Sequence, residues 1–474
     1  MATPRTAGAR GGRWIEHWEP EDERFWESTG RAVARRNLWA SIFAEHLGFS
    51  VWTIWAVLVL FMTPETGFDY TPEQKFLLVS MVTLVGAVLR VPYTLAVPRF
   101  GGRNWTLVSV TVLLVPTALA IVLIQRPETP FWLFLLLAAT AGLGGGNFSS
   151  SMSNINFFFP ERSKGWALGL NAGGGNIGVP SVQLLGLAVI AIFGIAQGWL
   201  LAAVYLPLLL VAGWVAWRHM DNLAGARADI GAQVAVAKDR HTWIMSFLYI
   251  GTFGSFIGYG FAFGLVLQNQ FDRTPLEAAA VTFIGPLLGS LIRPVGGSLA
   301  DRYGGARITL WNFVAMAAGT GVIIIAALQG SLALFTAGFV VLFLLTGVGN
   351  GSTYKMIPTI YSARAEDMVA AGTPRAEATA EAKRLAGALL GLVGAVGALG
   401  GVGINLVFRE SFAATGSATP AFVAFLVFYA VCIAVTYGVY LRRPRVRAEA
   451  ASPAAVPADA GPAAEAAPAG PQRP

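Results

Sequence analysis

One stretch of the chain occurs twice, once in each half. Residues 292–306 read IRPVGGSLADRYGGA, and residues 89–103 read LRVPYTLAVPRFGGR. The two superpose without gaps, with Arg293 on Arg90, at an offset of 203 residues that follows from 293 minus 90. This offset is close to half of the foldable part of the chain. Two halves related by duplication are typical of secondary transporters, whose halves rock around a site near the middle of the bilayer.

The composition indicates an integral membrane protein. The chain has 474 residues, of which 55% are hydrophobic and 12% charged, and its mean hydropathy is +0.59. Apolar stretches of roughly 20 residues, each able to cross a ~30 Å hydrocarbon core as a helix, begin near residues 37, 73, 105, 131, 165, 188, 242, 275, 307, 331, 383 and 418. We therefore expect an all-α membrane protein of twelve transmembrane helices in two pseudo-symmetric six-helix halves.

The distribution of basic residues predicts the orientation. The loops after every second apolar stretch are rich in cations, whereas the opposite loops hold few, and cytoplasmic loops carry the excess of Lys and Arg. Both termini are therefore expected in the cytoplasm, at the inner membrane of a bacterium. The formal charge of +7 follows this topology and does not indicate a nucleic-acid partner. The cationic loop residues are Arg99, Arg103, Arg162, Lys164, Arg218, Arg227, Lys238, Arg240, Arg302, Arg307, Arg364 and Arg375.

The segments outside the apolar stretches differ in composition. Residues 13–39 mix tryptophans with charges of both signs, which favours a cytoplasmic interfacial helix, with a partner-docking arm as the alternative. The Ala- and Pro-rich end of the chain has too few large apolar residues to fold. We divide the chain into an N-terminal interfacial segment, a six-helix half, a cytoplasmic linker, a second six-helix half and a disordered cytoplasmic tail: 1–36, 37–217, 218–241, 242–441 and 442–474.

Arg90 and Arg293 lie inside apolar stretches, where a cation costs ~2.5 to 3.5 kcal/mol on insertion scales. Each precedes its loop arginine by nine residues, which places it about 14 Å inside the membrane at ~1.5 Å per residue. A structural pair with buried carboxylates is the alternative, but Glu45 is the one acidic residue well inside an apolar stretch. The remaining partner is therefore expected to be a mobile anion. Guanidinium presents its donors as a planar fork, which suits a small planar oxyanion.

The stretch GSLADRYGGAR (297–307) resembles the loop signature of the major facilitator superfamily. The first copy departs from this signature, because Pro98 stands where Asp is expected. The resemblance implies the major facilitator fold. It also implies a part in conformational gating for Asp301 and Arg302.

Residues 142–179 are dense in glycine and asparagine. Close helix packing explains most of the glycines, but amide side chains are better explained by a pore interior, where they can donate to an anion. The asparagines are Asn147, Asn154, Asn156, Asn171 and Asn176. A second repeat relates GLGGGNFSSSM (142–152) to GVGNGSTYKM (347–356), and we align it with a one-residue gap.

These stretches and the paired arginines resemble the nitrate/nitrite porter family (NarK type) of the major facilitators, over about residues 18 to 440. The resemblance implies transport of nitrate and nitrite, with the anion clamped between the two arginines. It further implies that Asn176 donates to the anion, that the aromatic residues Phe148, Tyr259 and Phe263 sandwich or gate it, and that Gly173, Gly174 and Gly175 take part in gating. Tyr259 and Phe263 share one helix face by their spacing, which a core aromatic stripe would explain equally well.

The mode of coupling stays open between two mechanisms. A site with two fixed cations and one monoanion keeps a net positive charge, which favours nitrate/nitrite antiport over return of an empty carrier. Three membrane-embedded residues are candidates for proton coupling instead: Glu45, His46 and Lys355. The stretch FAEHLGFSVW (43–52) also resembles a subgroup of nitrate/proton symporters, so we favour symport. A structural role for His46 and a salt bridge between Glu45 and Lys355 are the alternatives.

Other classes of function have less support. The chain has four histidines and a single cysteine, Cys432, and shows neither a catalytic constellation nor a metal-ligand cluster, so we expect no enzyme, metal or cofactor. The Walker phosphate-binding motif does not occur, which excludes ATP-driven transport on this chain. A passive anion channel, an anion sensor, and a carrier for another small or organic anion stay open. We expect a monomer in the lipid bilayer, with protons as possible cosubstrates.

Overall fold

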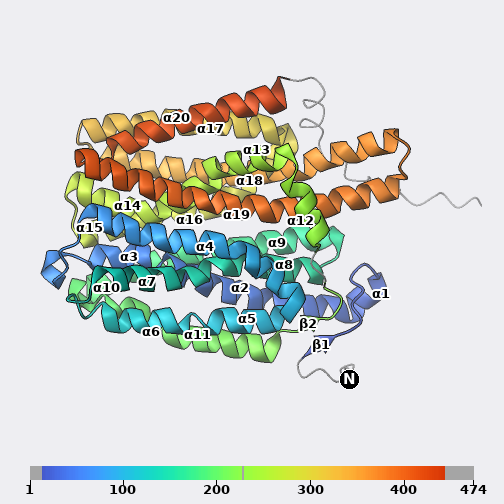
Figure 1. Cartoon of the computed structure of the whole chain (residues 1–474), viewed down its shortest axis with the longest axis horizontal. Helices are drawn as coiled ribbons and strands as arrows, with labels where there is room; N and C mark the ends of the chain where they lie inside the picture. The colour runs from blue at the N-terminus through green and yellow to red at the C-terminus, as the bar shows by residue number, and fades with distance from the viewer. Residues whose placement is uncertain (1–12, 227–228, 443–474) are drawn as a thin grey trace, which may run out of the picture.

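The computed structural model describes residues 13–226 and 229–442, which form a bundle of long helices in two halves (Figure 1). Within this described part, twelve helical spans are long and apolar enough to cross a membrane, which confirms the expected number. The N-terminal half comprises α2 (Arg31–Thr53), α3 (Trp55–Phe61), α4 (Pro72–Phe100), α5 (Gly102–Thr111), α6 (Leu114–Leu123), α7 (Phe131–Ala141), α8 (Asn147–Phe158), α9 (Glu161–Asn176), α10 (Gly178–Phe193) and α11 (Trp199–His219).

The C-terminal half repeats this arrangement after a linker that contains α12 (Ile230–Ala237). Its helices are α13 (Arg240–Tyr249), α14 (Ser255–Phe271), α15 (Pro275–Thr282), α16 (Ile284–Tyr303), α17 (Gly305–Leu328), α18 (Leu332–Ala370), α19 (Arg375–Thr415) and α20 (Thr419–Thr436). Short helical turns join several of these pieces into single spans: Trp26–Gly30, Gly142–Gly146, Ile250–Gly254 and Tyr437–Leu441.

One expected boundary is wrong. The sixth span does not begin near residue 188, because the fifth span continues unbroken from Glu161 to Phe193. Gly194 ends it with a positive φ of 82°, a conformation that glycine adopts without steric cost. The sixth span then runs from Ile195 to His219.

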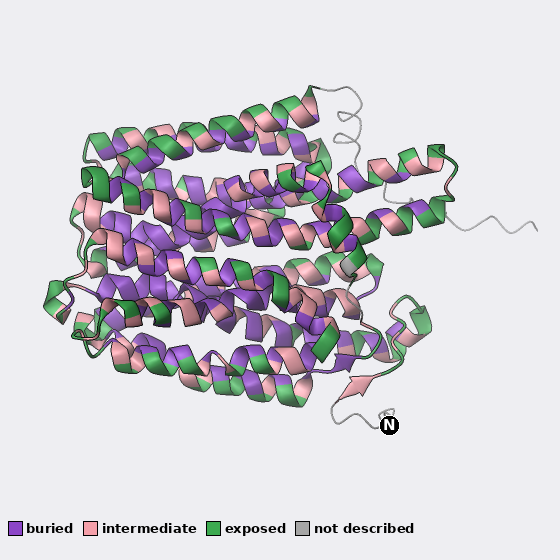
Figure 2. Ribbon diagram, in the orientation of Figure 1, coloured by how far each residue is buried: buried purple, intermediate pink, exposed green. Residues whose placement is uncertain are grey.

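Burial follows the position of each span in the bundle (Figure 2). In the first and seventh spans, 83% and 94% of the apolar window is buried, whereas the twelfth span has 28%. The outer helices present large apolar side chains outward, for example Trp311 at 63% and Ile192 at 70% exposure. The interface between the halves is therefore the interior of the molecule, and the outer helices offer an apolar surface to lipid.

We call the face that holds β1 (Trp14–Ile15), α1 (Glu23–Phe25) and α12 the terminal side, and the opposite face the distal side (Figure 1). The first apolar span enters the bundle from the terminal side, so odd-numbered spans run toward the distal side. On the terminal side, α18 and α19 continue beyond the other helices as a hairpin. The linker is attached to this hairpin, since Asp229 pairs with Arg384 at 2.7 Å and Asp239 with Arg364 at 2.5 Å.

We expected an interfacial helix over residues 13–39, but the N-terminal segment is not one continuous helix. Its first residues form β1 (Trp14–Ile15), which pairs in parallel with β2 (Asn222–Leu223) after the sixth span, and helical structure begins only at α1 (Glu23–Phe25). Trp18 packs edge-on against Phe158, with ring centroids 5.3 Å apart. The aromatic residue Trp18 therefore packs this segment against the helical bundle. The expected tail lies, apart from its first residue, outside the described residues.

Asp221 is the centre of this attachment. It is 4% exposed and accepts hydrogen bonds from Arg36 Nη2 at 2.6 Å and Asn37 Nδ2 at 2.9 Å. It also pairs with Arg13 Nε at 3.1 Å, next to β1. One buried carboxylate thus joins the N-terminal segment, the first span and the linker.

We expect the substitution Asp221→Asn to destabilise the protein by about 2 kcal/mol, because hydrogen bonds to a charged group contribute more than neutral ones. The measurement is the midpoint of thermal unfolding in detergent, followed by tryptophan fluorescence. The control is Glu366→Gln, which breaks the exposed pair with Arg375 and should leave the midpoint nearly unchanged. Equal midpoints for both variants would contradict the role of Asp221.

Candidate functional site

Arg90 is fully enclosed at the interface between the two halves. It lies in α4, is 1% exposed, and donates from Nη1 to the backbone carbonyl of Gly394 in α19 at 3.2 Å. Among the described residues, its Nε and Nη2 atoms have no hydrogen-bond partner. A permanently charged group is therefore buried with unused donors, which is unfavourable unless a further acceptor binds.

Aromatic rings surround the Arg90 guanidinium. Its central carbon lies 4.8 Å from the ring centroid of Phe148, 5.1 Å from that of Phe253 and 5.8 Å from that of Trp52. These are cation–π distances, and the electron-rich ring faces stabilise the charge. The structure thus places Phe148, which the family resemblance assigns to the anion, beside Arg90. It adds Trp52 and Phe253, which the sequence analysis missed.

Arg293 occupies the corresponding position in the second half, in α16. Its Nη2 donates to the Tyr249 hydroxyl at 3.2 Å, and its central carbon lies 5.6 Å from the Tyr354 ring centroid. Its buried Nη1 atom has no hydrogen-bond partner among the residues that the structure describes. The Tyr249 ring stacks on Phe253 at 5.1 Å, so one pair of aromatic residues connects the two arginines.

Tyr249 and Phe253 are spaced i, i+4, as are Tyr259 and Phe263 ten residues further along the same span. The latter two lie in an aromatic cluster with α18 and α20. The Tyr259 hydroxyl is 2.6 Å from that of Tyr429, and the Phe263 ring stacks on Phe339 at 4.1 Å. The contacts of Tyr259 and Phe263 are thus those of a core aromatic stripe, whereas the contacts to the arginines are made by Tyr249 and Phe253.

Glu45 is the acidic residue of this region. It is 1% exposed, and its Oε2 accepts a hydrogen bond from Asn171 Nδ2 at 2.7 Å. Asn171 is held in turn by Ser151, whose hydroxyl lies 2.8 Å from the same amide nitrogen. The charge of Glu45 interacts with both arginines, although its Oε1 has no hydrogen-bond partner within the described part of the chain.

The possible salt bridge between Glu45 and Lys355 does not form in this structure. Lys355 instead pairs with Asp301 at 2.8 Å, and both side chains are about half exposed, at 49% and 56%. The pair joins α18 to α16 within one half. His46 is half-buried, and its Nδ1 lies 3.2 Å from the carbonyl oxygen of Gly174.

Asparagine side chains contribute further unpaired groups. Asn176 is 2% exposed, and no described residue bonds its Oδ1. Both amide atoms of Asn147 are likewise without a hydrogen-bond partner among residues 13–226 and 229–442. At the offset of 203, Asn147 aligns with Asn350, so the one-residue gap in the second repeat is unnecessary. The Asn350 Oδ1 is buried and equally unpaired in the described structure.

The glycines at the end of α9 permit its close approach to α2. A Cβ atom on Gly174 would overlap with Ile42, and one on Gly175 would overlap with Glu45. Gly173 has open space around it within the described structure. Helix packing therefore accounts for two of the three glycines, and their part in gating stays a prediction, as it does for Arg302.

The site is closed on the distal side by contacts between the halves. Trp52 meets Phe261 at a centroid distance of 5.5 Å, and Phe76 stacks on Phe408 at 5.7 Å. These contacts pack the two halves against each other on the distal side.

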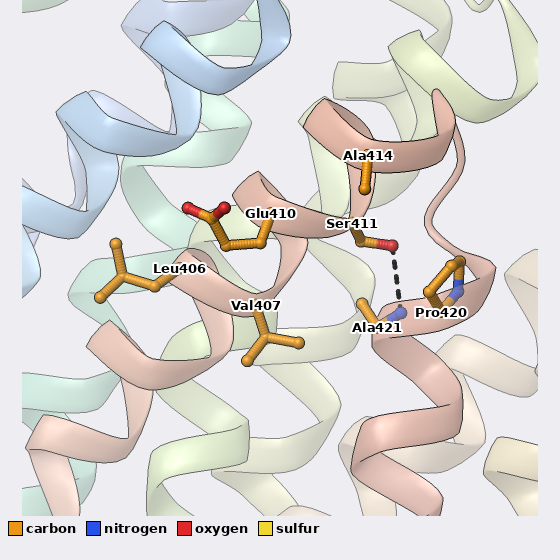
Figure 3. A pocket seen from close by; sticks show the side chains of 7 residues that line it. All are labelled: Leu406, Val407, Glu410, Ser411, Ala414, Pro420 and Ala421. Carbon is orange, nitrogen blue, oxygen red and sulfur yellow. Dashed lines mark hydrogen bonds between the residues drawn. The ribbon is translucent and has the colours of Figure 1, made fainter.

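An open hollow of about 360 Å³ lies elsewhere, at the distal ends of α19 and α20 (Figure 3). It is lined mainly by apolar side chains and contains none of the candidate residues. The Ser411 hydroxyl beside it accepts a hydrogen bond from the Ala421 amide at 3.1 Å and donates to the Ser417 carbonyl. Within the described residues, no group of three or more His, Cys, Asp or Glu could hold a metal ion.

Four residues of the site were missed by sequence analysis: Trp52, Tyr249, Phe253 and Tyr354. The spacing of Tyr249 and Phe253 is a usable signal, but the same spacing recurs ten residues later. Trp52 and Tyr354 lie within quoted stretches, 43–52 and 347–356, but neither stretch marks its aromatic residue as part of a site. Only their distances to the arginines distinguish them from other core aromatic residues.

The chain is similar to known membrane proteins over most of its length. The model of the Major Facilitator Superfamily matches residues 38–402. The nitrate/nitrite transporter NarU of Salmonella typhimurium is 40% identical over 448 residues, covering 90% of this chain and 96% of that protein. The probable nitrate/nitrite antiporter NarK2 of Thermus thermophilus is 35% identical, over 74% of this chain and 84% of that protein.

Among solved structures, a D-xylose-proton symporter superposes with a TM-score of 0.60 and 14% sequence identity, covering 88% of this chain and 98% of that one. This likeness shows the fold. The twelve apolar helices and the bacterial relatives make the chain a multi-pass protein of the inner membrane. By its matched family model and its relatives, the chain belongs to the nitrate/nitrite porter family of the Major Facilitator Superfamily.

Proposed function

We propose that this protein carries nitrate and nitrite across the membrane by alternating access, with the anion held between Arg90 and Arg293. The observation that supports this proposal is the set of unused donors on the two guanidiniums, which come from opposite halves. The names of the relatives specify the anion and imply transport rather than catalysis. Asn176 is proposed as a neutral donor to the same anion.

The chemistry of the site suits a flat monoanion. Each guanidinium can offer paired N–H groups to two oxygens of one ligand, and nitrate presents three oxygens in a plane. Phe148 and Phe253 add apolar walls beside Arg90. Low local polarity strengthens the attraction between the anion and the arginines. Because one arginine belongs to each half, binding draws both halves toward the same ligand.

The lysine variants Arg90→Lys and Arg293→Lys test this clamp. Each keeps the positive charge but loses the planar fork, so we expect nitrate affinity to fall at least about tenfold, the loss expected for one charge-assisted hydrogen bond. The measurement is isothermal titration calorimetry with nitrate on purified protein. Arg99→Lys, at an exposed position in the last turn of α4, is the matched control. Unchanged affinity in either site variant would overturn the clamp.

The two aromatic pairs can be separated by removing one hydroxyl from each. Tyr249→Phe deletes the hydrogen bond that orients Arg293, and we expect nitrate affinity to fall roughly three- to tenfold. Tyr259→Phe deletes the bond to Tyr429 and should leave nitrate affinity unchanged while lowering thermal stability. Calorimetry and thermal unfolding report the two effects. The reverse result would assign the anion to Tyr259 and Phe263, as the family resemblance implies.

For the coupling mode, we infer nitrate/proton symport with Glu45 as the residue that takes up the proton. Glu45 is buried, and one of its carboxylate oxygens has no hydrogen-bond partner within the described chain. Its charge is attracted to those of both arginines. Ionisable residues inside the membrane commonly serve proton transfer. His46 and Lys355 remain secondary candidates, and Lys355 is engaged by Asp301. Nitrate/nitrite antiport is the second candidate, supported by the excess of two arginines over one carboxylate.

The variant Glu45→Gln separates symport from antiport. The amide cannot exchange a proton, so we expect pH-driven nitrate uptake into proteoliposomes to be lost while nitrate/nitrite counterflow continues. The control is Glu65→Gln, which changes an exposed acid on the distal side. Uptake that still responds to an inward proton gradient in Glu45→Gln would remove Glu45 from the mechanism.

We also infer that the terminal side faces the cytoplasm, since the Arg- and Lys-rich loops lie there. The packing of the halves on the distal side supports the proposal of an inward-facing conformation. Asp301 with Lys355, and Gly173 to Gly175, are proposed to act in gating on that side. The described segments are proposed to serve as two transport halves joined by a cytoplasmic linker, in a monomer.

A further inference from the structure

Two glutamines cross between the halves on the distal side. Gln183 of α10 donates from Nε2 to the backbone carbonyl of Gly260 in α14, at 3.0 Å. Gln268 of α14 donates in the opposite direction, to the carbonyl of Leu60 in α3, at 3.3 Å. Each half thus reaches into the other with one amide. Gly260 and Gln268 are eight residues apart on one helix, so the two bonds lie about 12 Å apart along the transport axis.

The acceptor at Leu60 depends on the crossing bond. In a helix, the carbonyl of residue 60 would bond the amide of residue 64, but residue 64 is proline and has no N–H. Gln268 supplies the missing donor from the other half. The Gly260 carbonyl differs, because it lies inside α14, where the amide of Gly264 four residues later serves as its helical donor. Removal of Gln268 therefore destabilises the closed interface more than removal of Gln183 does, because only the Leu60 carbonyl is left without a donor.

The side-chain carbonyls of the same glutamines are unsatisfied. The Oε1 atoms of Gln183 and Gln268 are buried and find no hydrogen-bond partner in the described part of the chain. Opening of the distal side would give both oxygens access to water. Closure is therefore favoured by the two crossing N–H groups and opposed by the two buried oxygens, which keeps the closed state only modestly preferred.

We propose that Gln183 and Gln268, the distal glutamine pair, set the equilibrium between the distal-closed and distal-open states of the transport cycle. Their crossing bonds exist only when the halves meet on the distal side, so they act differentially on the two states. They are positioning residues, because they act through the packing of α3, α10 and α14. Their hydrogen bonds go to Gly260 and Leu60 and not to the arginines. The proposal rests on alternating access but not on the identity of the anion.

The test measures distal separation of the halves directly, without substrate. Spin labels are attached at Glu65→Cys in the first half and Ala413→Cys in the second, both exposed, with Cys432 replaced by alanine. Full-length protein in lipid nanodiscs is examined by double electron–electron resonance. We expect Gln268→Ala, which leaves the Leu60 carbonyl without a donor, to raise the ratio of the long to the short distance by roughly fivefold. Gln183→Ala should raise this ratio less, because the Gly260 carbonyl lies inside a helix and the variant also removes a buried unsatisfied oxygen.

A matched control and a conservative variant exclude a general loss of structure. Gln270→Ala also removes a glutamine from α14, but its Oε1 accepts from Ser417 and Ala418 within the same half, so the distances should not change. Gln268→Glu keeps the size and can donate only when protonated, so we expect the long distance at pH 8 and recovery of the short distance at pH 5. An unchanged distance distribution in Gln183→Ala and Gln268→Ala overturns the proposal, as does a Gln268→Glu variant without pH response.

Discussion

The structure depends on two guanidiniums at the interface of its halves, where Arg90 is buried, Arg293 is partly buried, and the described residues provide one carboxylate. A buried cation without a partner is strongly unfavourable, and here the surroundings compensate only in part. Aromatic ring faces stabilise Arg90, and the Tyr249 hydroxyl bonds Arg293. Donors remain unused on both side chains within the described structure. A bound anion would supply an acceptor for these donors, so the charge pattern supports the proposed transport of a small oxyanion.

The duplicated fold places one of the two charges in each half. Arg90 and Arg293 occupy equivalent positions in α4 and α16, one in each half. The seventh span contributes Tyr249 and Phe253, which stack and touch one arginine each. Any movement of one half relative to the other must therefore rearrange these contacts. The distal side holds the halves together through aromatic packing and the crossing glutamines.

Sequence analysis predicted the features that carry a local signal. Hydropathy predicted the twelve spans, the repeat predicted the halves and the arginine pair, and the family resemblance directed attention to Phe148. The start of the sixth span could not be predicted, because the apolar run is continuous and only the conformation of Gly194 divides it. The pairing of β1 with residues 222–223 joins segments about 200 positions apart and leaves no local pattern. Tyr249 and Tyr259 are alike in spacing and composition, so only the packing of the seventh span separates them.

The charges of the site constrain which states of a transport cycle can move through the bilayer. With Glu45 ionised, the empty site carries one net positive charge, and a nitrate ion makes it neutral. When Glu45 is protonated as well, the loaded site carries one positive charge again, equal to that of the empty site. A symport cycle then moves the same charge in both directions, so neither half of the cycle faces a higher electrostatic cost. Without the carboxylate, the empty site would carry two charges and the loaded site one, and only loaded states would reorient readily. In the proposed symport cycle, the charge of Glu45 is what allows an empty carrier to return.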